Sequence, residues 1–169
     1  MEALLFYSFA AVMVISSLMV ILRKNPIHSA LFLIVTFFCL GGVFLLLKAE
    51  FIAAIQIIVY AGAIMVLFLF VIMLLNVERE VASPSGHRMQ KLWALILSVA
   101  IGFSLISVMS ATVFTGEKGA LTPEAVSAAG NSETIGRLLF TDFLLPFEIT
   151  SILLLAGIIG AVILSKKKL

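Results

Sequence analysis

Few polar side chains that could take part in chemistry lie within the apolar parts of this sequence. Residues 51–75 form an uncharged run of 25 residues that nevertheless contains the amide of Gln56 and the phenol of Tyr60. An amide that faces hydrocarbon has no hydrogen-bond partner, so we expect Gln56 to face protein or water. Glu50 stands at the mouth of this run, and Glu148 is the sixth residue of a later one. Gln56, Glu50 and Glu148 are therefore the candidates for a polar path that could carry protons.

The two carboxylates have a second interpretation. A charge in the middle of a bilayer costs about 2.5–3.5 kcal/mol on insertion scales, so such charges usually have a role, and Glu148 could be a proton-relay carboxylate. At 1.5 Å per residue, however, it lies only roughly 8 Å from Phe143, near a helix start where the macrodipole favours an acid. We expect Glu148 to be an interfacial acid, and we expect the same of Glu50.

The sequence lacks the residue patterns that hold cofactors or metals. It has no glycine-rich phosphate loop and no CxxC pair, and its single cysteine, Cys39, lies within an apolar run where a small buried side chain is expected. His28 lies at an expected membrane edge and His87 in a polar link, so the paired histidines of a membrane haem protein are missing. We assign no catalytic, cofactor-binding or metal-binding residue to this chain.

Composition places the chain in a membrane. Of its 169 residues 63% are hydrophobic and only 12% are charged, whereas a soluble domain carries roughly 25% charge. The mean hydropathy is +1.26. The charges lie in short clusters between apolar runs, and no basic residue precedes Arg23, so we expect the first run to be retained as a membrane span rather than cleaved as a signal.

Five apolar runs are each long enough for a helix to cross a bilayer, which takes roughly 20 residues. They are residues 3–22, 27–47, 51–75, 92–114 and 143–164. Strands are excluded because the runs are continuous rather than alternating. Asn25-Pro26 suits the start of the second helix, since Asn caps and Pro fits the first helical position. We predict an all-α integral membrane protein, a single membrane domain over residues 1–169, whose first three helices are antiparallel neighbours joined by short links.

Charge asymmetry predicts the orientation. One side of the five-span layout carries eight Lys and Arg residues, namely Arg23, Lys24, Arg79, Arg88, Lys91, Lys166, Lys167 and Lys168. The other side carries three, namely Lys48, Lys118 and Arg137. The positive-inside rule puts the eight in the cytoplasm. The N-terminus and the long loop over residues 115–142 are then outside, and the C-terminus is cytoplasmic.

The run at 51–75 is built in two unlike halves. Ala53, Gln56, Tyr60, Ala63 and Leu67 follow one another at steps of three or four, so they share one face of an α-helix. That face is small and polar in the first half of the run, whereas the second half is almost entirely bulky aliphatic and Phe. We expect this face to pack against protein or water.

Gly62 lies within the same run and has two interpretations. Glycine lowers helix propensity by about 1 kcal/mol relative to Ala. A helix weakened in this way can accept one extra residue as a π-bulge, a feature often found at functional sites. The simpler alternative is that Gly62 only permits a close helix crossing, and the residues alone leave both open.

Three stretches carry a resemblance that spans the chain. They are "IQIIVYAGAIMVLFLFVIMLLN" in the third run, "NPIHSALFLIVTFFCLGGVFLLL" in the second and "LLPFEITSILLLAGIIGAVIL" in the last. Together with the five-helix layout, they closely resemble subunit J (chain 6) of the proton-pumping NADH:quinone oxidoreductase, respiratory complex I.

The resemblance implies a function without a reaction site of the chain's own. Members hold no cofactor; NADH, FMN, iron–sulfur clusters and quinone belong to the enzyme complex, which lies in the bacterial cytoplasmic (inner) membrane. The implied partners are the membrane subunit that forms the quinone site, the small subunits A and K, the antiporter-like subunits, quinone and lipid, with no nucleic acid.

The resemblance also implies a moving part. The third helix of the family changes between a regular α-helix and one with a π-bulge, which rotates its inner half and opens or closes a water path. By residue, the bulge falls on Tyr60, Ala61, Gly62 and Ala63. The half that would rotate carries Val66 and Phe68.

Other functions stay open on the sequence alone. The chain could be the equivalent subunit of a related cation/proton antiporter or membrane-bound hydrogenase, or a purely structural scaffold. A self-contained channel or transporter would be expected to show charges inside its spans or an inverted repeat, and we find neither in the sequence.

Overall fold

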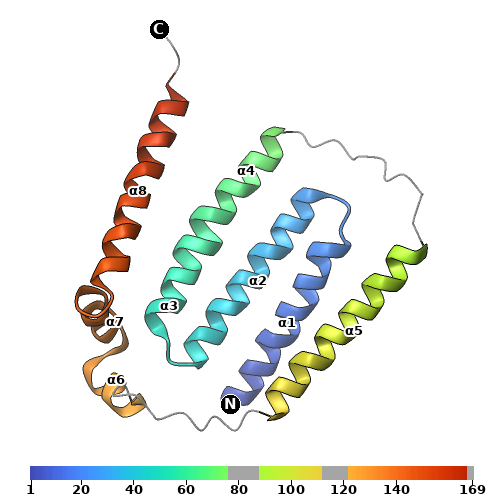
Figure 1. The fold of residues 1–169 in the computed structure, drawn as a ribbon, viewed down its shortest axis with the longest axis horizontal. Helices are drawn as coiled ribbons and strands as arrows, with labels where there is room; N and C mark the ends of the chain where they lie inside the picture. The colour runs from blue at the N-terminus through green and yellow to red at the C-terminus, as the bar shows by residue number, and fades with distance from the viewer. Residues whose placement is uncertain (76–87, 112–121, 167–169) are drawn as a thin grey trace.

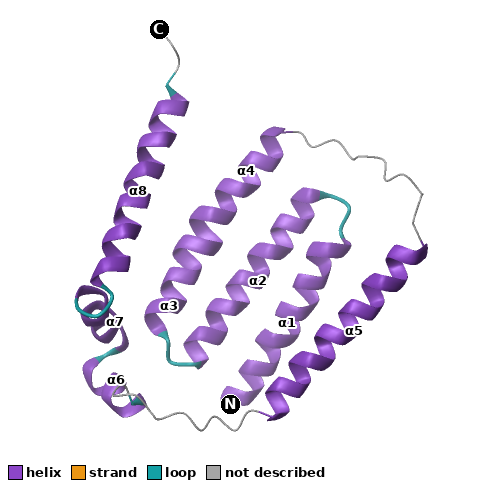
Figure 2. Ribbon diagram, in the orientation of Figure 1, coloured by secondary structure: helices purple, strands orange, loops and turns teal. Residues whose placement is uncertain are grey.

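The protein is helical throughout the part that the structure describes. The computed structural model describes residues 1–75, 88–111 and 122–166, and in these ranges it contains helices and no strand (Figure 2). Five of the helical segments are long and apolar enough to cross a membrane. The all-α fold with five candidate spans is thereby confirmed. His87, residues 112–114 of the fourth predicted span and the end of the lysine tail lie outside the described residues.

The first two spans form a tight antiparallel pair, α1 (Glu2–Leu22) and α2 (Pro26–Leu46). The predicted cap between them is present, because the Asn25 side chain accepts a hydrogen bond from the Ile27 N–H at 2.9 Å. Small residues allow the helices to approach closely. A Cβ atom added at Gly42 of α2 would lie only 2.8 Å from the ring of Phe9 in α1.

The third span packs against the other side of α2, so that α2 lies between it and α1 (Figure 1). This span has three parts, α3 (Glu50–Ile55), a π-helical segment η1 (Gln56–Ile64) and α4 (Met65–Leu75). The prediction that the first three spans are antiparallel neighbours is therefore confirmed, and α2 is the element against which the third span is positioned.

The two remaining spans, α5 (Arg88–Ala111) and α8 (Leu144–Ser165), stand apart from this three-span bundle. Two short helices, α6 (Pro123–Ala129) and α7 (Asn131–Phe140), divide the described part of the long loop. Of these, α7 contacts both α8 and the start of α3. The loop therefore connects the last span to the third one, although its sequence by itself indicates only a polar link.

Candidate functional site

The π-helical segment is the feature that singles out the third span. At its start the Gln56 N–H donates to the Ile52 carbonyl, which is the four-residue spacing of an α-helix. At its end the Met65 N–H donates to the Tyr60 carbonyl, which is the five-residue spacing of a π-helix. One extra residue has thus been accommodated between these two points. The π-bulge expected around residues 60–63 is present as a longer segment, Gln56–Ile64.

The extra residue shifts which side chains face the bundle. Ala53 and Gln56 are buried, as predicted, and Gln56 is only 6% exposed. The buried face then continues through Ala61 and Met65, a step of five followed by a step of four.

The prediction that Tyr60, Ala63 and Leu67 share a face with Ala53 and Gln56 assumed an unbroken α-helical period, which the π segment interrupts. Tyr60 is 46% exposed, and Ala63 and Leu67 are also exposed. A step of five is the spacing that a π turn imposes on residues of one face, so the burial pattern and the backbone hydrogen bonds agree.

Gly62 lies within the π segment, close to the backbone of the preceding turn. A Cβ atom at this position would be 3.2 Å from the carbonyl oxygen of Ile57, five residues earlier in the same helix. No other heavy atom of the described chain lies within 4 Å of that point, apart from the atoms of the helix's own adjoining turn. In this conformation Gly62 therefore relieves crowding inside its own helix, rather than serving a close crossing with another helix of this chain.

Two contacts hold η1 against α2. A Cβ atom added at Gly41 would lie 3.0 Å from Cγ1 of Ile57. One turn earlier on α2, the ring of Phe37 meets the ring of Tyr60 edge-on, with centroids 6.0 Å apart. The pair Phe37 and Gly41 on α2 and the pair Ile57 and Tyr60 on η1 thus form matching stripes. We call these four residues the α2–η1 contact.

The half of the span beyond the π turn contains the other predicted site residues. Val66 is exposed. Phe68 lines a groove of about 380 Å³ together with Ile72 and residues near the α1–α2 turn, among them Arg23, Ala30 and Leu33. Ala61, Met65 and Phe68 follow one another at steps of four and three along this half; Ala61 and Met65 are buried, whereas Phe68 is 47% exposed.

The polar candidates do not come together in this chain. Glu50 is exposed at the first turn of α3, and Glu148 is exposed in the second turn of α8. Of the three, only Gln56 is buried. Within those residues no cluster of His, Cys, Asp and Glu could hold a metal ion. In the described part of the chain, Glu50, Gln56 and Glu148 do not form a continuous chain of polar groups.

The sequence reasoning missed several residues that position the π segment. The sequence could have indicated Gly41, because adjacent glycines in the middle of an apolar helix are typical of close contacts on two sides. It could not have indicated Ile57 or Met65, since an Ile or a Met in an apolar run does not show which way its side chain faces. Asn131, whose side chain accepts a hydrogen bond from the Phe51 N–H at 3.1 Å, is 80 residues away in the chain.

Comparison with known proteins gives one consistent result. A family model described as NADH-ubiquinone/plastoquinone oxidoreductase chain 6 matches residues 16–164. NAD(P)H-quinone oxidoreductase chain 6 of Leptolyngbya boryana is 41% identical over 167 residues, covering 96% of this chain and 79% of the relative. NADH-quinone oxidoreductase subunit J of Rhodobacter capsulatus is 38% identical over 165 residues, covering 95% and 79%. The chloroplast subunit 6 of Mesostigma viride is 40% identical over 155 residues, covering 92% and 79%.

Proposed function

The chain belongs to the NADH-ubiquinone/plastoquinone oxidoreductase chain 6 family, and from that membership we propose that it is a non-catalytic membrane subunit of a proton-translocating NADH:quinone oxidoreductase. In this proposal NADH, FMN, iron–sulfur clusters and quinone are bound by other subunits. The chain's neighbours are the subunit that forms the quinone site, the small membrane subunits and the antiporter-like subunits. The three relatives are named as quinone oxidoreductase chains, which favours this function over that of a hydrogenase or antiporter subunit.

The proposed role of the chain is to couple quinone reduction to proton translocation through its third span. Removing the extra residue from the π segment would return the span to a regular α-helix. With α3 fixed, the half beyond the π turn would then rotate by about 100° and shift by about 1.5 Å, the values for one residue of α-helix. Tyr60, Ile64 and Leu67 would take the places that Ala61, Met65 and Phe68 occupy now.

One observation carries the proposal, namely the π-helical segment Gln56–Ile64 in the middle of a span that is otherwise α-helical. Such segments are rare and appear frequently at functional sites. Gln56, the first residue of the segment, is buried against the rest of the chain, as expected of an amide that faces protein rather than lipid.

We place the protein in the bacterial cytoplasmic membrane as a single multi-pass domain, with the N-terminus outside and the C-terminus in the cytoplasm. The support is the distribution of Lys and Arg along the chain. In this orientation α3 lies toward the outside and α4 toward the cytoplasm.

Paired cysteines test the mechanism in the assembled enzyme. In a Cys39→Ala background, Leu33→Cys with Phe68→Cys joins residues that line one groove in the π register. In a regular α-helix Leu67 would take the place of Phe68, so Leu33→Cys with Leu67→Cys is the matched pair for the α register. We expect the first pair to cross-link in the resting enzyme and the second to cross-link increasingly during turnover. Locking the first pair should stop quinone reduction and proton uptake together, and reductant should restore both.

NADH oxidation by an artificial acceptor controls for assembly, since it does not need the membrane coupling step. A complete Leu33–Phe68 cross-link with undiminished quinone reduction and proton uptake would show that the span does not have to move, and the proposed mechanism would then be wrong.

A further inference from the structure

The third span begins without a cap of its own. The first N–H groups of any helix have no partner inside the helix, and a side chain just before the start usually accepts one of them. At α2 this residue is the adjacent Asn25. At α3 the corresponding residue is Ala49, which has no side chain able to accept a hydrogen bond.

Asn131 supplies the missing acceptor from another part of the chain. Its side-chain Oδ1 accepts a hydrogen bond from the Phe51 N–H at 3.1 Å, across a sequence separation of 80 residues. Asn131 is the first residue of α7, and α7 contacts α3 in the structure. The cap is therefore a tertiary contact that ties the long loop to the start of the third span, five residues before the π segment.

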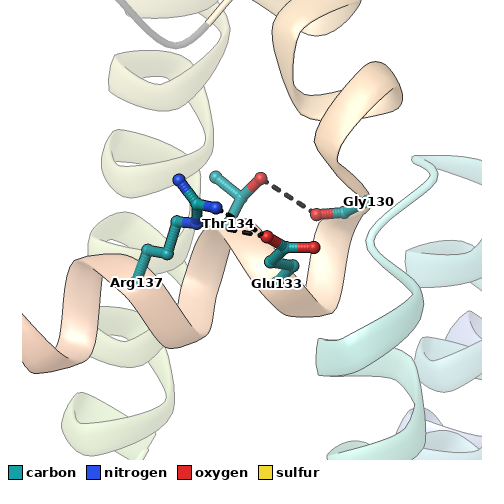
Figure 3. A network of polar contacts seen from close by, with 4 residues as sticks. All are labelled: Gly130, Glu133, Thr134 and Arg137. Carbon is teal, nitrogen blue, oxygen red and sulfur yellow. Dashed lines mark hydrogen bonds and ion pairs between the residues drawn. The ribbon is translucent and has the colours of Figure 1, made fainter.

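The geometry of the loop holds Asn131 in place. Gly130 has a φ of +90°, a conformation that disfavours residues with a side chain. The buried Thr134 donates its hydroxyl to the Gly130 carbonyl at 2.9 Å (Figure 3). On the exposed side of the same helix, Arg137 pairs with Glu133 at 2.9 Å (Figure 3). That ion pair is not part of the cap.

We propose that Asn131 is a positioning residue that fixes the Glu50 end of the third span. When η1 changes between the π and the α register, α4 then rotates and α3 does not. This inference rests on the proposed function. A helix that loses one residue from a π turn can accommodate the change by turning either of its two ends. The hydrogen bond that the Phe51 N–H donates to Asn131 holds one end, and the other end is then the one that turns.

A merely structural cap would have different consequences. If Asn131 only stabilised the protein, its loss would lower the amount of assembled enzyme and reduce quinone reduction and proton uptake in proportion. If it positions the span, its loss lets part of the rotation occur in α3. The number of protons taken up per NADH oxidised then falls while quinone reduction continues.

The experiment compares Asn131→Ala, Asn131→Asp and Glu133→Ala in the assembled enzyme. Asn131→Asp keeps an acceptor at the helix start, and Glu133→Ala removes a side chain of the same helix that is outside the cap. Hydrogen exchange of the peptide containing residues 49–55 reports the cap directly. We expect exchange about five-fold faster in Asn131→Ala alone, the change that corresponds to one hydrogen bond of about 1 kcal/mol.

The second measurement is the ratio of protons to electrons in vesicles. We expect a lower ratio in Asn131→Ala and wild-type ratios in the other two variants. Unchanged exchange would mean that there is no cap, and faster exchange with an unchanged ratio would mean that the cap does not serve coupling; either result overturns the inference. Both outcomes are distinct from failure of the proposed function, which the Leu33 cross-links report with Asn131 in place.

Discussion

Two adjacent glycines of α2 offer a matched test of whether the α2–η1 contact matters for coupling. In Gly41→Ala the new methyl group would lie 3.0 Å from Cγ1 and 3.1 Å from Cδ1 of Ile57, on the π segment. In Gly42→Ala it would lie 2.8 Å from the ring of Phe9, on α1. The chemical change is the same, and only the neighbouring helix differs.

The expected magnitudes follow from two opposing effects. Each substitution gains up to about 1 kcal/mol in helix propensity. Each also adds a methylene-sized volume to a filled contact, which typically costs about 1–3 kcal/mol. For Gly41→Ala the net effect is a destabilisation of the π segment packed on α2 by about 0–2 kcal/mol. A shift of 1–2 kcal/mol changes the ratio of the π to the α register by about 5–30-fold. For Gly42→Ala the cost acts on the α1–α2 pair instead, and the rigid ring makes it the larger of the two.

The assay combines the Leu33 cross-linking pairs with NADH:quinone turnover. Gly41→Ala should lower the yield of the Leu33–Phe68 link and change turnover and proton uptake, with little loss of assembled enzyme. Gly42→Ala should reduce assembly or thermal stability, while the cross-linking pattern of the enzyme that remains stays that of the wild type. If both variants have the same phenotype, or if Gly41→Ala leaves the cross-links and both activities unchanged, the contact does not control the register.

Two further predictions concern charge. Glu148→Gln should retain more than half of proton uptake, because Glu148 is exposed near the start of α8 and has no titratable partner among the described residues; loss of uptake with assembly preserved would instead make it a relay acid. Reporter fusions after Leu169 should be active only in the cytoplasm, and a tag in the loop over residues 115–142 should be reachable from outside; the reverse pattern would contradict the orientation inferred from Lys and Arg.

The spans could be predicted because length and hydropathy alone determine them. Each apolar run is long enough as a helix to cross the roughly 30 Å hydrocarbon core of a bilayer. The structure reproduces their described bounds to within a residue or two, except that α5 begins four residues earlier, at Arg88. The start of α2 was equally readable, since Asn25 and Pro26 act on the backbone next to them. Signals of this kind are local, so they need no knowledge of neighbouring helices.

The face of the third span could not be predicted in the same way. The buried face of a helix is predicted from the sequence by assuming a fixed number of residues per turn. One inserted residue therefore changes the predicted orientation of every residue after it. Gly62 indicated where the helix could deform, but it is compatible with a close crossing as well. Ala61 and Met65 therefore appear on the buried face only when the backbone itself is known. The cap from Asn131 is a tertiary contact, which no local pattern indicates.

The π segment depends on both helices of the α2–η1 contact. A turn with more residues is wider, so it needs room on the side where it touches a neighbour. Gly41 gives that room opposite Ile57, and the residues buried before and after the widest part, Ala53 and Ala61, are small. Gly62 removes the crowding within the turn itself. Since van der Waals packing rather than water exclusion joins helices in a bilayer, a change of one methyl group on α2 should shift the register as effectively as a change on the third span.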